Sequence, residues 1–155
     1  MRRASARGVL PLTPGDALRL WSDVARWPTF IEGFARVLQV GRGWPEVGGR
    51  VVWESTPDGR GRVTETVVES APDRFSTQVF EEALMGTQTL RVLPASDGSE
   101  VELSLEYELA KYGPLGGVAD ALFIRRALRD SLRRTLTRFA IEAAEDARTL
   151  PDNPA

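Results

Sequence analysis

The middle of the chain alternates apolar and polar residues with the period of two that is typical of β-strands, and turn-forming residues interrupt it about every ten residues. This pattern predicts six antiparallel strands over residues 35–40, 50–56, 61–70, 74–81, 87–93 and 100–108. In the last of them, one face carries apolar residues and the other mostly glutamates, so one face is expected to be buried and the other exposed to water. The apolar residues of that strand are Val101, Leu103, Leu105 and Tyr107.

A strand near residues 4–10 and a helix that starts at Thr13 are predicted before the meander. Thr13 can cap the helix, Pro14 suits its first position, and Asp16 complements the positive end of the helix dipole. Pro28 disfavours helical geometry at the preceding Trp27, so a second short helix is expected between residues 29 and 33.

The glycine-rich segment 113–117 ends the strand pattern, and a long helix is predicted over residues 118–148. Its apolar stripe must cover something, and the meander is the only sheet available. We therefore expect the helix to lie on the apolar face of the sheet, and residues 148–155 to form a frayed tail. The stripe consists of Val118, Leu122, Leu132, Leu136, Phe139 and Ala143.

The composition is that of an ordinary globular domain, with 42% hydrophobic and 27% charged residues in 155. We expect residues 1–155 to form a single domain. The formal net charge of −2 gives no global positive excess, so nucleic acid is not an expected partner. No segment reaches the roughly 20 apolar residues of a membrane span, and the N-terminus lacks the apolar core of a secretory signal, which predicts a cytoplasmic protein.

The chain contains neither cysteine nor histidine. This excludes disulfides, thiolate nucleophiles and histidine-dependent triads, and it argues against ordinary zinc sites. We expect no metal and no cofactor.

Three segments and the order of the predicted elements are similar to one known group of proteins. The segments are ALRLWSDVARWPTFIEGFARV at residues 17–37, VGGRVVW at residues 47–53 and YGPLGG at residues 112–117. The chain resembles the START-like (SRPBCC) superfamily, which includes polyketide cyclase/dehydrases and lipid-transport proteins. The resemblance implies an α+β helix-grip fold, in which a curved antiparallel sheet of about seven strands wraps around a long C-terminal helix, with two short helices after the first strand.

The resemblance also implies an internal cavity between sheet and helix, lined by large side chains. Simple core packing is the alternative for each of them. Trp53 is placed inside on account of its bulk, and Gln78 shares a face with Phe80, so a buried Gln78 would need a partner such as a ligand oxygen. The predicted ligand-binding residues are Trp27, Phe30, Trp53, Gln78, Phe80, Tyr107, Leu122, Phe123 and Arg125.

Arg125 lies on the apolar stripe of the long helix, where it could bind a carboxylate or polarise a ligand carbonyl. Alternatively, its stem covers apolar surface while the guanidinium reaches water. Glu54, Glu65 and Glu106 are expected to face solvent, as most carboxylates on alternating strands do.

Three functions remain open. In the first, the domain binds a hydrophobic, polyketide-like or lipid-like small molecule without altering it. In the second, it is an enzyme of the polyketide aromatase/cyclase type that acts by positioning its substrate, without histidine or cysteine chemistry. In the third, large side chains fill the interior and the domain is an interaction module. The sequence leaves the oligomeric state open, a homodimer included.

Overall fold

The computed structural model describes residues 1–109 and 118–149. Its strands form one antiparallel sheet in the order β1-β7-β6-β5-β4-β3-β2. The strands are β1 Arg2–Leu10, β2 Phe34–Val40, β3 Arg50–Ser55, β4 Arg62–Ala71, β5 Arg74–Phe80, β6 Leu84–Ala95 and β7 Gly98–Leu109. Each strand from β2 to β7 pairs with its neighbour in sequence, which is the predicted meander, and β1 closes the far edge against β7.

The helices are α1 Pro14–Ser22, α2 Trp27–Phe30 and α3 Val118–Thr149, with a 3₁₀ turn at Val24–Arg26. The Thr13 hydroxyl caps α1 by accepting a hydrogen bond from the Asp16 amide at 3.3 Å. The expectation that Pro28 keeps Trp27 out of a helix is wrong, because Trp27 has helical angles (φ −56°, ψ −35°). Pro28 lies in the first turn of α2, where a helix needs no donor from it, so α2 begins before the proline.

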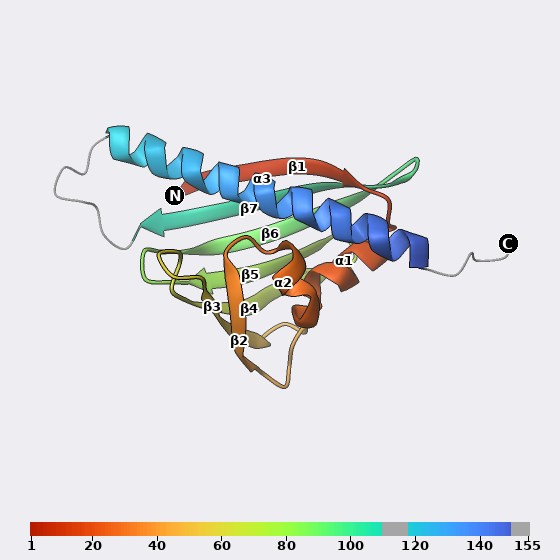
Figure 1. Ribbon diagram of the computed structural model, residues 1–155, viewed down its shortest axis with the longest axis horizontal. Coiled ribbons are helices and arrows are strands. Elements are labelled where there is room, and N and C mark those ends of the chain that lie inside the picture. The colour runs from red at the N-terminus through yellow and green to blue at the C-terminus, as the bar shows by residue number, and fades with distance from the viewer. Residues whose placement is uncertain (110–117, 150–155) are drawn as a thin grey trace, which may run out of the picture.

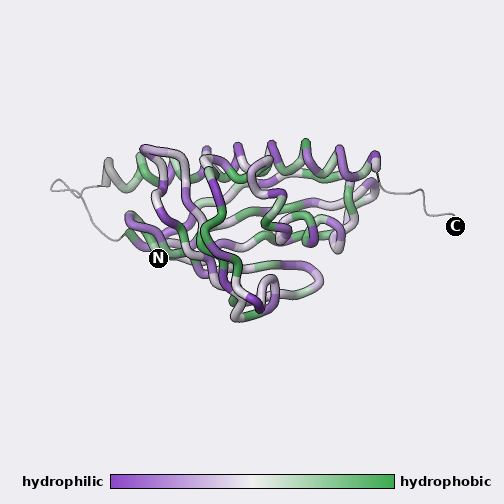
Figure 2. The backbone as a smooth tube through the Cα atoms, turned by 60° about the horizontal axis from the view of Figure 1, so that its bottom comes forward, coloured by the Kyte–Doolittle hydropathy of each residue, from purple (hydrophilic) through white to green (hydrophobic). Residues whose placement is uncertain are grey.

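Helix α3 lies along β1 and spans the sheet from end to end, whereas α1 and α2 cover only one end (Figure 1). Hydrophobic and hydrophilic residues alternate along the strands, as a sheet with one covered face requires (Figure 2). This is the predicted helix-grip architecture, and most strand boundaries lie within two residues of the predicted ones. Strand β6 is longer than predicted because Leu84, Met85 and Gly86 still pair with β7.

Packing is tight beneath the C-terminal half of α3. Phe139 is fully buried. The centre of its ring lies 5.2 Å from the ring centre of Trp21 and 5.0 Å from that of Phe30. Arg26 fixes the same end of the helix through ion pairs of 2.7 Å to Glu142 and to Asp146. One end of the space between helix and sheet is therefore filled with side chains.

Two sequence expectations fall outside the described residues. The glycine-rich motif at residues 112–117 is one, and residues 150–155 of the expected tail are the other. Arg148, the predicted last residue of the helix, and Thr149, which the sequence places in the tail, both belong to α3. Within residues 1–109 and 118–149, no helix is long and apolar enough to cross a membrane.

Candidate functional site

A row of inward-facing residues crosses the sheet from β7 to β4. Strand pairing places Tyr107 of β7 opposite Gly86 of β6, and Gly86 opposite Val79 of β5. Val79 in turn pairs with Glu65 of β4. Because alternate residues of a strand point to the same face, this row lies on the covered side with buried Val63 and Val67.

Glu65 is a carboxylate in the middle of this apolar face, and its exposed fraction is only 5%. The indole Nε1 of Trp53 donates to its Oε2 at 2.7 Å, and the Thr77 hydroxyl donates to its Oε1 at 2.8 Å. Both donors are neutral. Since a carboxylate offers about four acceptor positions, Glu65 keeps capacity for a further donor.

Tyr107 supplies a second buried polar group. Its exposed fraction is 0%, and its hydroxyl has no hydrogen-bond partner among the described residues. A buried hydroxyl without a partner costs on the order of 1–3 kcal/mol, so native structures rarely keep one without reason. A partner that the described residues do not provide would remove this cost.

The inner face around these groups is incompletely covered. Gln88 points inward from β6, a central strand of the sheet, and is nevertheless partly exposed. Ile124 and Leu128, on the N-terminal half of α3, are also only partly buried. Beyond the packed cluster around Phe139, Gln88 of the sheet and Ile124 and Leu128 of the helix are therefore only partly covered.

Gly86 cannot carry a side chain here. A Cβ atom at this position would lie 2.2 Å from the Glu106 carbonyl oxygen and 3.0 Å from the Cα atom of Tyr107. The glycine therefore lets the strands approach and leaves the inner face beside Tyr107 without a covering side chain.

A cation borders the site at β3. The guanidinium of Arg60 lies 5.0 Å from the centre of the Trp53 ring and pairs with Glu81 at 2.5 Å. Trp53 is thus held on one side by a cation and through its indole N–H by Glu65, which fixes the orientation of the ring.

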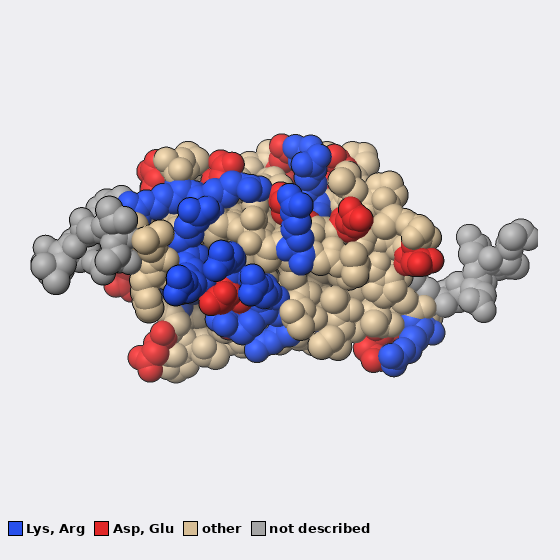
Figure 3. Space-filling model, turned by 90° about the horizontal axis from the view of Figure 1, so that it is seen from above, with Lys and Arg blue, Asp and Glu red and all other residues tan. Residues whose placement is uncertain are grey.

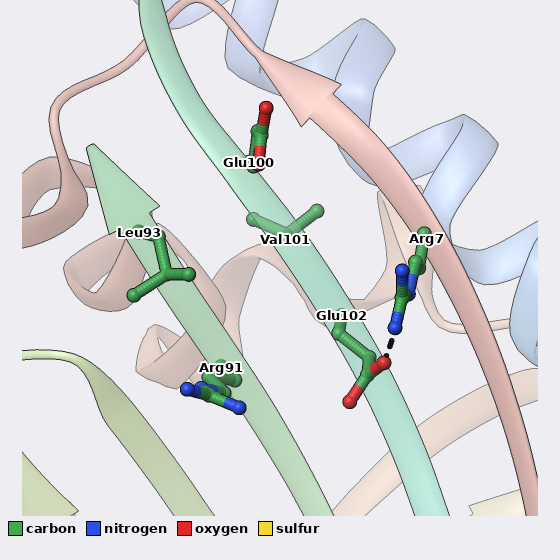
Figure 4. A pocket seen from close by; sticks show the side chains of 6 residues that line it. All are labelled: Arg7, Arg91, Leu93, Glu100, Val101 and Glu102. Carbon is green, nitrogen blue, oxygen red and sulfur yellow. Dashed lines mark hydrogen bonds and ion pairs between the residues drawn. The ribbon is translucent and has the colours of Figure 1, made fainter. Parts of the chain in front are cut away.

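A separate hollow of about 180 Å³ lies on the opposite face of the sheet (Figure 4). Arg7 extends from β1 towards Glu102 of β7 and pairs with it at 3.0 Å, while Arg91 extends from β6. The Arg7 side chain is 83% exposed. Exposed ion pairs of this kind contribute little to stability, and the hollow does not reach the buried groups on the inner face.

The structure buries four of the nine predicted site residues. Trp27, Phe30, Trp53 and Tyr107 each have an exposed fraction of 2% or less. Trp27 and Phe30 belong to the packed cluster, because Trp27 donates to the Trp21 carbonyl at 2.7 Å and Phe30 packs on Phe139. Trp53 donates to Glu65, and Tyr107 belongs to the strand row that contains Glu65.

The inward orientation expected for Phe80 and Gln78 is wrong. Phe80 is 45% exposed and Gln78 is exposed as well, because Phe75, Thr77 and Val79 are the residues of β5 that point inward. The three residues of α3 are also turned to solvent: Leu122 is 58% exposed, Phe123 is 73% exposed, and Arg125 is exposed.

The most polar part of the site differs from what the sequence pattern predicts. Glu65 was expected to face solvent and is buried, whereas Glu106 is exposed as expected and the Glu54 side chain is 40% exposed. Thr77 and Gln88 are not among the predicted site residues. Val63 and Val67 alternate with Glu65 on one face, and this alternation was the signal that could have placed the carboxylate inside.

A family model described as polyketide cyclase / dehydrase and lipid transport matches residues 1–144. The chain belongs to this family. Among solved structures, this polyketide cyclase/dehydrase family member is similar to a protein of Thermus thermophilus, with a TM-score of 0.77 and 19% identity over 94% of this chain and 99% of that one.

Two further structures similar to this family member have named activities or pathways. The di-domain ARO/CYC StfQ of the steffimycin biosynthetic pathway matches with a TM-score of 0.76 and 18% identity over 95% of this chain and 52% of that one. Norcoclaurine synthase of Thalictrum flavum matches with a TM-score of 0.66 and 15% identity over 94% and 95%. At these identities the likeness establishes the fold. No curated protein matches the sequence.

Proposed function

We propose that this family member binds an oxygenated, mainly apolar small molecule on the inner face of the sheet. The observation that carries the proposal is the fully buried Tyr107 hydroxyl, which has no hydrogen-bond partner among the described residues. A ligand carbonyl or hydroxyl would accept a hydrogen bond from it and remove the cost of the unpaired group.

The neighbouring residues suit such a ligand. Glu65 can accept a hydrogen bond from a ligand hydroxyl, and the amide of Gln88 can donate or accept one. Val79 and Leu105, both buried on the same face, supply apolar contact. A few polar anchors on an otherwise apolar surface are typical of small-molecule sites.

An enzyme of the cyclase type is the second candidate, and the buried Glu65 carboxylate favours it. In this reaction the Tyr107 hydroxyl hydrogen-bonds a ketone oxygen of a poly-ketone, which makes the adjacent C–H more acidic. Glu65 takes that proton, the resulting enolate carbon forms a C–C bond to a second carbonyl, and the proton returns to the alkoxide oxygen. Holding the chain so that one carbonyl is near the enolate selects the ring that forms.

The interaction module with a filled core has less support. Its interior would be occupied by side chains, whereas Gln88 on the inner face is partly exposed. A cytoplasmic location remains a prediction from the sequence.

Native mass spectrometry of the protein purified from its own host tests the proposal. We expect a stoichiometric compound that contains oxygen, and a lower occupancy in the Tyr107→Phe variant, which loses one hydroxyl and keeps the ring. A bare mass for the wild-type protein, with no thermal shift across a panel of apolar ketones and phenols, would contradict ligand binding and favour the filled-core module.

A further inference from the structure

The first two-thirds of α3 carries an unusual concentration of positive charge. Residues 118–138 contain six arginines and two acidic residues, Asp120 and Asp130, although the whole chain has a net charge of −2. Figure 3 views the molecule from above the helix, and Lys and Arg atoms gather over the end where α3 begins. The net charge of this helix segment is therefore positive, whereas that of the whole protein is negative.

Four of these arginines form an unpaired cluster. Arg125, Arg126, Arg129 and Arg133 are all exposed, and none has an ion-pair partner among the residues that the structure describes. By contrast, Arg134 pairs with Glu32. Like charges three and four residues apart on a helix repel each other, so the cluster costs stability unless an anion neutralises it.

Two large apolar side chains lie beside the cluster. Leu122 is 58% exposed and Phe123 is 73% exposed. Leu122 precedes Arg126 by four residues and Phe123 precedes it by three, so both lie next to it on the helix surface. Arginines flanked by exposed leucine and phenylalanine are the arrangement found in helices that lie at a membrane interface.

From this arrangement we propose that the first half of α3 docks the protein onto an anionic lipid bilayer. Arg126, Arg129 and Arg133 contact lipid phosphates, and Leu122 and Phe123 enter the boundary between headgroups and acyl chains. The apolar pair favours a bilayer over duplex DNA, whose phosphate backbone needs arginines but not buried leucine and phenylalanine. The proposal goes beyond ligand binding and does not depend on it.

Flotation with vesicles tests this surface. The full chain is mixed with phosphatidylcholine vesicles and with vesicles that also contain phosphatidylglycerol, at low and at high salt. We expect binding only to the anionic vesicles, weakened by salt because exposed charges are screened. Each arginine on an anionic surface contributes about fivefold in affinity, so the triple variant Arg126→Gln/Arg129→Gln/Arg133→Gln is expected to lose on the order of a hundredfold.

A matched control separates the location of the charge from its amount. The variant Arg42→Gln/Arg62→Gln/Arg91→Gln changes the net charge equally, and its three exposed arginines have no ion pair in the described part of the chain. It is expected to bind as the wild type does. The double variant Leu122→Ser/Phe123→Ser is expected to bind about tenfold more weakly.

Several results would overturn the proposal. They are no binding by the wild type, equal binding to neutral and anionic vesicles, and equal losses in the two triple variants. Binding to duplex DNA or to an acidic protein that the helix variant loses, without vesicle binding, would assign the cluster to that partner instead. Circular dichroism and thermal unfolding verify that each variant is folded.

Discussion

Glu65 is a carboxylate that is only 5% exposed on the apolar inner face of the sheet. Its two oxygens accept hydrogen bonds from Trp53 and Thr77, so replacing one oxygen by an NH₂ group leaves one of these donors facing another donor. We expect Glu65→Gln to lower the free energy of unfolding by about 1–2 kcal/mol and to weaken binding of a ligand that carries a hydroxyl. Urea unfolding measures the first effect and calorimetric titration the second.

Glu54→Gln is the control for this substitution. Glu54 lies on β3 with its side chain 40% exposed and forms an ion pair with Arg36 at 2.8 Å. Its replacement is expected to change stability by about 0.5 kcal/mol or less. If both variants had the same small effect, the buried carboxylate would have no special role.

Single residues were predicted correctly where size decided the outcome. Trp53 was placed inside because of its bulk, and it is fully buried. Gln78 and Phe80 were predicted on the wrong face. Phe75 and Phe80 point to opposite faces of β5, and the sequence alone does not say which of the two is buried. Glu65 was missed because its burial depends on Trp53 and Thr77, which lie on neighbouring strands.

At the scale of elements, the segment after α2 is tied to α3 by one buried hydroxyl. The Glu32 amide donates to the Thr135 Oγ1 at 3.1 Å, and Thr135 is 6% exposed. Thr135→Val keeps the shape and removes the acceptor, so we expect the free energy of unfolding to fall by about 1–2 kcal/mol in chemical denaturation.

Thr137→Val is a matched substitution two positions further along α3. The Thr137 hydroxyl is exposed and donates to the Arg133 carbonyl within the helix. Its loss is expected to change stability by less than about 0.5 kcal/mol. A result in which Thr137→Val were as costly as Thr135→Val would argue against the contact with Glu32.

The same junction gives the protein a dependence on pH. Burial raises the pKa of the Glu32 carboxyl, but hydrogen bonds from Arg134 and Ser131 outweigh it, and the net pKa lies below its usual range. Because the folded pKa is below the unfolded one, Glu32 stabilises the fold above the unfolded pKa, and this contribution is lost as the pH falls through the folded pKa.

We therefore expect thermal stability to decrease as the pH is lowered from about 5 to about 3, and Glu32→Gln to make this decrease smaller. Melting curves over this range measure the effect. An unchanged slope in the variant would show that the ion pair with Arg134 does not contribute.

Most of the elements were predictable because their signals are local. Alternation, turn residues and the Thr13 cap depend on neighbours in sequence, and the strands and helices appear close to the predicted bounds. The start of α2 was not predictable in this way. Trp27 is held in place by a tertiary contact, because its indole donates a hydrogen bond to the Trp21 carbonyl. Here the fold overrides the local preference that Pro28 imposes.

At the scale of the whole molecule, the space between α3 and the sheet is divided into two parts. Phe139, Trp21 and Phe30 fill the end near α1, whereas Glu65 and Tyr107 lie in the row of paired residues that crosses the sheet from β4 to β7. The sequence predicted that helix and sheet face each other but not this division, which depends on how far the helices after β1 extend beneath α3.

The most direct test of the ligand site compares a ketone with a hydrocarbon of the same shape. 2-Acetylnaphthalene and 2-isopropenylnaphthalene differ in that a CH₂ group replaces the oxygen that the Tyr107 hydroxyl would contact. Isothermal titration of the wild type and of Tyr107→Phe with both compounds isolates that contact. We predict that the variant binds the ketone about tenfold more weakly and the hydrocarbon unchanged, as expected for one hydrogen bond. Equal affinity of the two proteins for the ketone would contradict the site.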